Sequence, residues 1–403
     1  METNTKVMTG ANPKLEELQN FLSENFDFRY NVLTDMPECK PKNTNTYRMI
    51  DKRMMNTLSF EAMMDGVDCK DADVKRFLFS ERIPTFHPFK DYIDALPEWD
   101  GTDRVTTLAA RVSGKAMWLN GFHRWMLGMV AQWLGYPARC ANALAPILIS
   151  TEQGMCKSTF CSMILPEELR PYYTDKFTIT STSGCEQKIS TFGLINMDEF
   201  NQYNERMMTI LKNLMQMKKV NYRKCFKAYY SDLPRIASFI GTSNEKSLLT
   251  DETGSRRFLC IEVERPIDCS PIEYPQLYAQ LKFELESGKR YWLSKEEELE
   301  IQENNQAFYK QSTEEEVFFK VFRLPKEGEP FVKMTASSIF DMLQKRYPAL
   351  MRGANVRQFG KVLCHIGAKK SRSSMGSMYE VALVGRTVKS DSEVETTELK
   401  QVG

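Results

Sequence analysis

The stretch "APILISTEQGMCKSTF", residues 145–160, decides the fold of this chain. A short apolar run at 145–149 leads into a polar turn that contains Gly154, and helical character resumes at Lys157. Strand, loop and helix in this order are typical of a phosphate-binding loop, whose backbone N–H groups converge on an anion where the helix begins. Such a loop also needs a lysine for the β- and γ-phosphates and a hydroxyl for Mg²⁺, and Lys157 and Ser158 fit these roles.

The loop departs from the usual pattern at two positions. The pattern G-x-x-x-x-G-K-[ST] would place glycines where this chain has Thr151 and Cys156. Gly154 supplies one permissive position, and cysteine is small enough for the loop if position 156 keeps an ordinary backbone conformation. Because the stretch taken alone is more often an accident of composition, the rest of the chain has to decide.

Two further apolar runs end in polar residues that suit nucleotide hydrolysis. The run 194–197 ends in Asp198 and Glu199, of which one can hold hydrated Mg²⁺ while the other polarises an attacking water. The run 236–240 leads to Asn244, whose amide can orient that water against the γ-phosphate. Each feature alone is equally typical of an ordinary strand end, so the order in which they follow the loop carries the prediction.

A pair of arginines follows in the turn "DETGSRRF", residues 251–258. An arginine suits the transition-state charge of a phosphoryl group, especially when it is donated to the site of a neighbouring subunit. Arg257 is our first choice for this role and Arg256 the second. An isolated pair of this kind is more often an exposed surface pair.

In this order, the pieces resemble the virulence-associated protein E family, which is found in phages and mobile elements. That family is related to superfamily 3 helicases and to the helicase halves of phage primase-helicases, which are ATPases of the AAA+ type that act as ring-shaped DNA motors. The resemblance covers residues 84–265. It rests on the stretches "FHPFKDYIDALPEWDGTDRV" (86–105), "EQGMCKSTF" (152–160), "NMDEF" (196–200), "VNYRKCFKAYYSDLPRIASFIGTSN" (220–244) and "DETGSRRFLCIEV" (251–263).

The resemblance implies ATP and Mg²⁺ as cofactors and gives each residue a role. Ser158 and Asp198 would hold Mg²⁺, and Glu199 would activate the water. Asn244 would sense the γ-phosphate, and Arg257 or Arg256 would be the arginine that a neighbouring subunit supplies. It also implies a homo-oligomeric ring, expected to be a hexamer, that acts on single-stranded or forked DNA, with a separate primase as a possible partner. The nucleotide would be bound by Gly154, Met155, Cys156, Lys157, Ser158 and Thr159.

Residues 206–235 form a basic region in which lysines and arginines alternate with aromatic residues and only one acid, Asp232, occurs. This pairing suits phosphate contacts together with base stacking. The resemblance places a hairpin here that projects into the channel of the ring, whereas the alternative is a solvated basic helix face. The predicted DNA contacts are Lys218, Lys219, Arg223, Lys224 and Lys227.

Residues 342–379 form a second basic region, with eight lysines and arginines and no acid. A capped helix, a second helix and a basic turn that leads into a strand give the outline of a winged helix, which binds DNA with its second helix and wing. A winged helix can equally mediate protein contacts. The predicted DNA contacts are Arg357, Lys361, Lys369, Lys370 and Arg372.

The composition limits the binding partners and the cellular location that we expect. The net charge of +1 gives no global attraction to nucleic acid or membrane, so any basic surface must be local. The ten cysteines form no Cys-x-x-Cys pair, and no signal peptide or apolar run of about 18 residues occurs, so we expect a cytoplasmic protein with free thiols.

The sequence therefore predicts an α/β protein with a P-loop NTPase core of the AAA+, superfamily 3 type. We expect an ATP-dependent DNA helicase or translocase of a phage or mobile element; the alternative is a DNA-binding replication initiator or adaptor with a vestigial nucleotide site. The predicted parts are a mainly helical N-terminal region of unknown role (1–83), a helical lead-in (84–140), the ATPase core (141–290), a helical linker (291–330), the winged helix (331–385) and a disordered tail (386–403).

Overall fold

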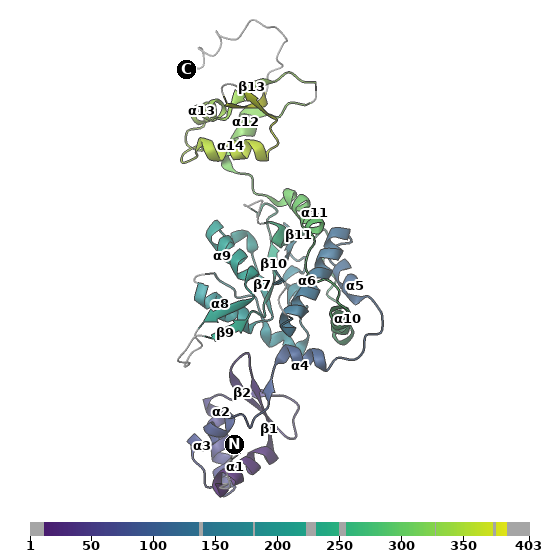
Figure 1. Ribbon diagram of the computed structural model, residues 1–403, viewed down its shortest axis with the longest axis vertical. Coiled ribbons are helices and arrows are strands. Elements are labelled where there is room, and N and C mark those ends of the chain that lie inside the picture. Colours follow the sequence, from purple (N-terminus) through teal and green to yellow (C-terminus); the bar gives the residue numbers. More distant parts are fainter. Residues whose placement is uncertain are drawn as a thin grey trace, which may run out of the picture. The chain divides into compact units, whose positions relative to one another are not determined.

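The computed structural model of the chain describes residues 12–136, 140–179, 182–222, 231–249, 255–326, 328–373 and 376–384. The chain divides into two compact units, one that ends at Tyr309 and one that begins at Lys310 (Figure 1). The linker predicted at 291–330 is divided between them. The tail predicted at 386–403 lies outside the described residues.

The centre of the first unit is a sheet of five parallel strands in the order β11-β5-β10-β7-β6. Strands β5 and β7 are buried along their whole length, which is why they appear in the sequence as unbroken apolar runs. This sheet confirms the α/β prediction. The strands are β5 (Ala145–Ile149), β6 (Tyr173–Thr174), β7 (Leu194–Met197), β10 (Ser238–Ser243) and β11 (Phe258–Glu262).

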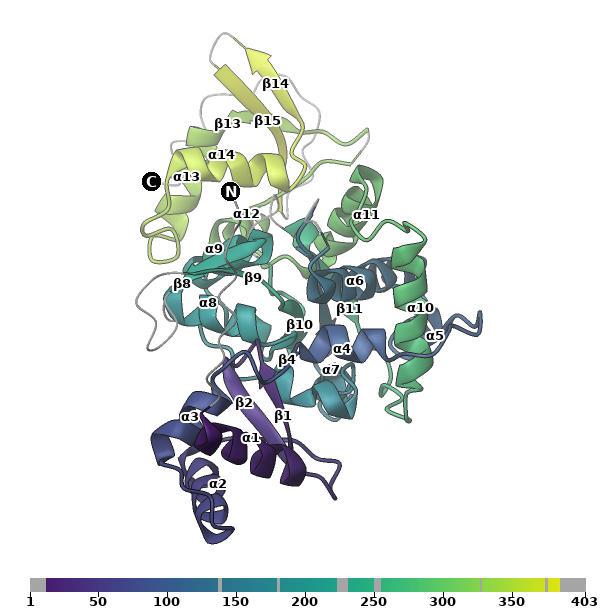
Figure 2. The ribbon, with the colours of Figure 1, turned by 60° about the horizontal axis from the view of Figure 1, so that its bottom comes forward.

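Helices cover both faces of this sheet (Figure 2). Leu148, Ile240 and Leu259 point to the face that packs against one group of helices, whereas Ile147 and Phe239 point to the opposite face. Alternate residues of a strand thus enter two separate cores. The first group is α4 (Pro88–Asp94), α5 (Arg104–Ala110), α6 (Ala116–Leu134) and α10 (Tyr274–Glu286), and the second is α8 (Thr182–Thr191) and α9 (Glu205–Gln216).

Helix α6 is the longest helix against the sheet, and its amino-acid pattern predicts both its course and its end. Trp118, Trp125 and Trp133 are almost completely buried, because they recur on the face that packs into the core. The helix ends at Gly135, which adopts the left-handed conformation with φ 67° that glycine accommodates without steric cost. The helix lies within the stretch 84–140, for which the sequence predicts a helical lead-in.

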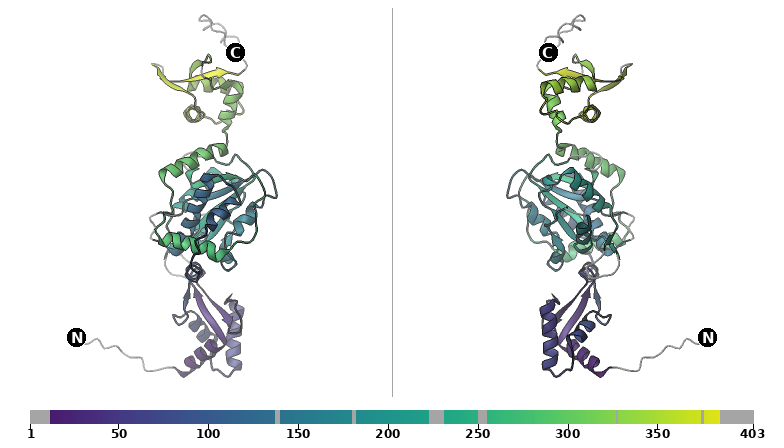
Figure 3. Two further views of the ribbon diagram at one scale, coloured as in Figure 1. Left: turned by 90° about the vertical axis from the view of Figure 1, so that its right-hand side faces the viewer. Right: turned by 90° about the vertical axis from the view of Figure 1, so that its left-hand side faces the viewer.

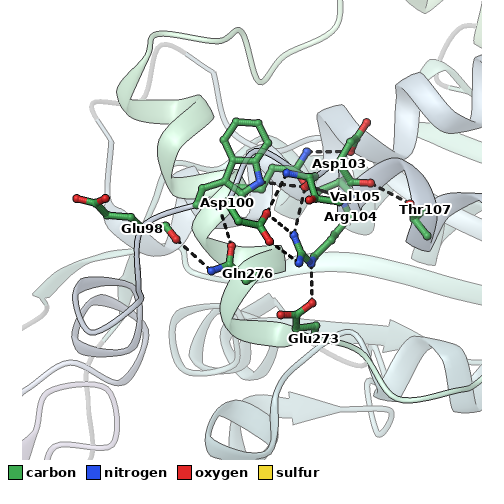
Figure 4. Close-up of polar contacts among 11 residues, drawn as sticks. Glu98, Asp100, Asp103, Arg104, Val105, Thr107, Glu273 and Gln276 are labelled. Carbon is green, nitrogen blue, oxygen red and sulfur yellow. Dashed lines mark hydrogen bonds and ion pairs between the residues drawn. The ribbon is translucent and has the colours of Figure 1, made fainter.

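The lead-in stretch "EWDGTDRV" acts as a structural clamp between α5 and α10 (Figure 4). The Arg104 guanidinium donates to both carboxylate oxygens of Asp100, at 2.6 and 2.7 Å, and to Glu273 Oε2 at 2.8 Å. This arginine holds the pKa of the Asp100 carboxyl well below its usual range. Asp103 caps the start of α5 by accepting from the Thr106 N–H at 3.0 Å. Asp100 and Asp103 are therefore occupied in holding the helices together.

The N-terminal part combines three helices with a four-stranded sheet in the order β3-β2-β1-β4 (Figure 3). The predicted helices are present, but the sheet was not predicted. Leu22, Cys39 and Leu58 belong to one buried cluster, so α1 and α2 pack directly on the strands. The elements are α1 (Pro13–Asn25), β1 (Phe26–Asn31), β2 (Met36–Pro41), β3 (Arg48–Met49), α2 (Lys52–Met64), α3 (Asp71–Leu78) and β4 (Thr85–Phe86).

The second unit contains three helices and a small antiparallel sheet around one core. The two helices and the hairpin that the sequence predicts are all present. The expected linker contributes α12 to this core through Val317 and Phe318, so α12 belongs to the unit itself. The elements are α12 (Thr313–Val321), β12 (Phe322–Arg323), β13 (Val332–Thr335), α13 (Ala336–Arg346), α14 (Val356–His365), β14 (Lys370–Ser373) and β15 (Gly376–Leu383).

Within the described ranges, no helix combines the length and the apolar character that crossing a lipid bilayer requires.

Candidate nucleotide site

The candidate site lies at the edge of the sheet where β5, β7 and β10 end. Parallel strands deliver their carboxyl ends to the same edge, and β10 lies between β5 and β7. The loop that follows β5 therefore meets Asp198 after β7 and Asn244 after β10. A short helix, α7 (Lys157–Ser162), begins directly after the loop. The structure thus brings together residues that the sequence predicted separately.

Lys157 is the centre of this arrangement. Its side chain is only 8% exposed, and its Nζ donates to the Ser150 carbonyl at 3.1 Å and to Asn244 Oδ1 at 3.0 Å. Burial lowers the pKa of the Lys157 ammonium, and the nearby Asp198 carboxylate partly offsets this effect. Among the residues that the structure describes, no carboxylate lies within ion-pair distance of this nitrogen. The ammonium is therefore held by neutral oxygens and can still accept an anionic partner.

Asp198 lies between two hydroxyl groups. Ser158 Oγ donates to Asp198 Oδ1 at 3.2 Å, and Thr242 Oγ1 donates to the same oxygen. A carboxylate and hydroxyls from α7 and β10 form the set of hard oxygen ligands that Mg²⁺ prefers, so the residues fit this ion. Thr242 was not predicted from the sequence, although a hydroxyl two residues before Asn244 at the end of an apolar run is a signal that could have identified it.

Two of the predicted residues have an unusual backbone. Cys156 adopts φ 58° and ψ 23°, and Glu199 adopts φ 51° and ψ 46°, both in the left-handed region. The condition that position 156 keeps an ordinary backbone is therefore not met. A side chain in this region costs about 1–3 kcal/mol, and such strain concentrates at functional sites. In the described part of the chain, only one other non-glycine residue, Asp35, has a positive φ.

The other predicted residues of the site differ in how far they are buried. Gly154 has φ 77°, which glycine adopts without strain. Met155 is buried, and its carbonyl accepts from the Ile267 N–H at 3.2 Å, so the segment after β11 packs against the loop. Thr159 is exposed on α7. Glu199 is also exposed, and its carboxylate accepts from Gln202 Nε2 at 2.6 Å.

Arg256 and Arg257 do not lie with the other predicted catalytic residues. They end a short turn of 3₁₀ helix directly before β11, and Phe258 at the start of β11 pairs in register with Ala145 at the start of β5. Because the two strands are parallel, both arginines are at the edge of the sheet opposite the loop. Arg256 also forms an ion pair with Glu298 at 3.1 Å. Neither arginine is placed to act on the loop of its own chain.

The first basic region contains a two-stranded hairpin of β8 (Lys219–Tyr222) and β9 (Ser231–Pro234). Lys218 and Lys219 are exposed at its base. Arg235 belongs to the same basic stretch of sequence but is completely buried. Its Nη2 donates to the Asn142 carbonyl at 2.9 Å. The predicted contacts Arg223, Lys224 and Lys227 lie outside the described residues.

The second basic region forms a surface on α14 and β14. Phe359 and Leu363 bury one face of α14 in the core of the unit, which leaves the opposite face in solvent. Five basic residues in this short stretch of chain are exposed, and we call them the basic surface: Arg357, Lys361, Lys369, Lys370 and Arg372.

Comparison with known families divides the chain at the same place as its fold. Residues 93–310, more than half of the chain, match the virulence-associated protein E-like domain. Residues 311–381 match a domain of unknown function described from a B. Theta gene (DUF3874). The change from one family to the other coincides with the change from one compact unit to the other. No curated protein matches the sequence.

Solved structures with a similar arrangement come from the NrS-1 C terminal region. The apo structure of this region (305-718) is 12% identical, with a TM-score of 0.44, and the alignment covers 93% of this chain and 100% of that one. Its A form is also 12% identical, with a TM-score of 0.45 and a coverage of 92% and 100%. Neither likeness is close enough to bear on the chemistry of the site.

Proposed function

Because the chain belongs to the virulence-associated protein E-like family, we propose that it is an ATP-dependent DNA helicase or translocase that acts in the replication of a phage or mobile element. The observation that carries the proposal is the position of Lys157. Its side chain contacts both Ser150, directly after β5, and Asn244, 87 residues further along the chain. In this proposal, the central sheet and its loop are a P-loop NTPase core of the AAA+, superfamily 3 type.

The side chains at the sheet edge divide the work of hydrolysis. Lys157 exchanges its two neutral oxygen partners for oxygens of the β- and γ-phosphates. Ser158 and Asp198 would hold Mg²⁺, which would supply positive charge to neutralise the charge that develops on the phosphates. Glu199 accepts a proton from the attacking water, and Asn244, released from Lys157, orients that water toward the γ-phosphate.

The position of the two arginines supports the ring of subunits that we propose. Arg257 lies at the opposite edge of the sheet from its own loop, so we infer that it serves the loop of a neighbouring copy. An arginine supplied in this way stabilises transition-state charge and makes hydrolysis depend on assembly. A hexamer is the expected assembly.

DNA contacts are proposed at two places. The β8-β9 hairpin is the candidate for the channel of the ring, and the second unit, interpreted as a winged helix, would bind DNA through the basic surface. The exposed face of α14 would then act as the recognition helix and the β14-β15 hairpin as the wing. Positive charge on these elements, rather than net charge of the chain, would supply the attraction.

The decisive experiment measures ATP hydrolysis with and without single-stranded DNA, alongside the oligomeric state in solution. We expect DNA-stimulated hydrolysis in the wild type and in Lys75→Ala, which removes an exposed lysine of the N-terminal part, and none in Lys157→Ala. Full activity of Lys157→Ala would show that the loop is not the site. Absence of hydrolysis in the wild type, with DNA binding unaffected by nucleotide, would favour the replication initiator or adaptor with a vestigial site.

A further inference from the structure

Two cysteines from distant parts of the sequence meet at the loop. Cys156 is exposed at the start of α7, and Cys269 is half-buried in the segment that follows β11. The hydrogen bond from the Ile267 N–H to the Met155 carbonyl, at 3.2 Å, fixes this segment against the loop. Cys156 directly follows Met155 and Cys269 lies two residues beyond Ile267, so this bond places the two cysteines close to each other. Burial, and after it the nearby Cys156 thiol, raises the pKa of the Cys269 thiol.

The surroundings of the two thiols differ in a way that suits stepwise oxidation. Cys156 is open to solvent, so a small oxidant can reach its sulfur directly. Cys269 packs against the apolar core, in the segment that the Ile267–Met155 bond holds beside Cys156. Cys161, on the buried side of α7, is enclosed by the core and is therefore protected from an oxidant in solution. The exposed and the half-buried thiol form a reactive and a resolving pair.

We propose that Cys156 and Cys269 form a reversible disulfide under peroxide, and that this modification closes the loop to nucleotide. The sulfur of Cys156 attacks the peroxide, which gives a sulfenic acid and one molecule of water. The Cys269 sulfur then attacks the sulfenic sulfur, so that the S–S bond forms and a second water leaves. Two thiols are oxidised by two electrons in total, the peroxide is reduced, and a reducing dithiol restores both thiols by exchange.

The consequence for nucleotide binding rests on the proposed function. A disulfide of about 2.05 Å is much shorter than any non-bonded contact between two thiols, so the loop must be drawn toward the segment after β11. Cys156 directly precedes Lys157, and the turn at Cys156 sets the direction in which α7 begins. Linking this residue to Cys269 removes the freedom of the loop to close around phosphates.

The proposal also gives a reason for a cysteine at a strained position. Glycine would adopt the left-handed conformation of residue 156 without the cost of about 1–3 kcal/mol that a side chain carries there. A thiol with a partner within reach gives this position a role that glycine cannot fill.

The test treats the full-length protein with hydrogen peroxide and maps its disulfides by mass spectrometry of peptides prepared without reduction. We expect a Cys156–Cys269 peptide in the wild type and in Cys364→Ser, which removes an exposed thiol of the second unit, and none in Cys269→Ser. In parallel, binding of a fluorescent ATP analogue should weaken at least about tenfold on oxidation of the wild type and recover with dithiothreitol. Reduced Cys269→Ser should bind the analogue normally and lose none of this affinity reversibly.

The outcomes separate the modification from the enzyme activity. Absence of the linked peptide under conditions that oxidise Cys364 would overturn the proposal, as would equal affinity for the analogue before and after the disulfide forms. If the peptide forms but even the reduced protein binds no ATP analogue, the modification site stands and the proposed ATPase function fails. A circular dichroism spectrum of Cys269→Ser verifies that this variant is folded.

Discussion

The candidate nucleotide site and the basic surface of the second unit are built in opposite ways. At the site, side chains of α7 form individual hydrogen bonds with side chains that follow β7 and β10. Lys157 bonds to Asn244, and Ser158 bonds to Asp198. The basic surface comes from one helix and the strand that follows it, and its five side chains all face solvent. A single substitution should therefore abolish the function of the first region, whereas the second should lose its function gradually with each charge removed.

A large effect on turnover without loss of binding is expected for Glu199→Gln, because the Glu199 carboxylate is proposed to accept the proton of the attacking water. The rate of ATP hydrolysis should fall by about 10²–10⁴-fold, while nucleotide binding remains, since the amide keeps the shape of the side chain. Steady-state hydrolysis and a separate binding titration measure the two quantities. Glu205→Gln, at an exposed position in α9, should hydrolyse ATP normally. Near-normal turnover in Glu199→Gln would remove the carboxylate from the mechanism.

The second prediction tests whether the site is completed by another chain. Arg257→Ala and Lys157→Ala should each be inactive alone. The first lacks the arginine that is supplied to the neighbouring loop, and the second lacks the lysine of the loop itself. Mixed in one ring, they should regain part of the wild-type activity at interfaces that combine an intact loop with an intact arginine. Hydrolysis is measured over a range of mixing ratios. A fully active monomer would rule out a residue supplied by a neighbouring copy.

A smaller and graded effect is expected on the basic surface. Replacing its five residues by glutamine should weaken DNA binding and reduce the salt dependence by about 0.9 in the slope of log K for each phosphate that the protein no longer neutralises. Basal ATP hydrolysis should not change. Fluorescence anisotropy at several salt concentrations gives both the affinity and the slope. The matched control replaces five exposed basic residues of the N-terminal part by glutamine and should bind DNA normally: Lys52, Arg53, Lys70, Lys75 and Arg76.

The smallest effect concerns stability and separates the two departures from the loop pattern. Cys156→Gly should stabilise the fold by about 1 kcal/mol, because it relieves a left-handed side chain, whereas Thr151→Gly should not, because Thr151 has no positive φ. Both substitutions restore a glycine of the usual pattern, so only the backbone conformation distinguishes them. Thermal unfolding measures the difference. Equal shifts in the two variants would contradict the role of backbone strain.

The site could be predicted from the sequence where each residue follows a buried strand. Asp198, Glu199 and Asn244 all come directly after apolar runs, and such runs are typical of a parallel sheet covered on both faces. Thr242 could have been identified by its place near the end of an apolar run, but its contact with Asp198 could not, because that contact depends on β10 lying beside β7. The left-handed turn at Cys156 has no local signal either, since nothing in the residues around it requires a positive φ.

Two errors have physical reasons of their own. The N-terminal sheet was missed because β1 and β2 are only partly buried, and β2 contains Pro37 and Pro41, which are unusual inside a sheet. Arg235 was counted with an exposed basic region because its neighbours in the sequence are basic. Its burial is set by Gln132 and Asn142, which accept hydrogen bonds from its guanidinium and lie far away in the sequence.

The buried Arg235 has a mechanical consequence for the hairpin of the first basic region. Its N–H donates to the Lys218 carbonyl at 3.1 Å across the base of the hairpin, and its guanidinium donates to the carbonyls of Leu214, in α9, and Asn142, shortly before β5. The hairpin is therefore clamped at its root to the strand that leads into the loop. In the described part of the hairpin, this one arginine therefore ties the base of β8 and β9 to α9 and to the segment before β5, so that removal of its guanidinium would disconnect the hairpin from both.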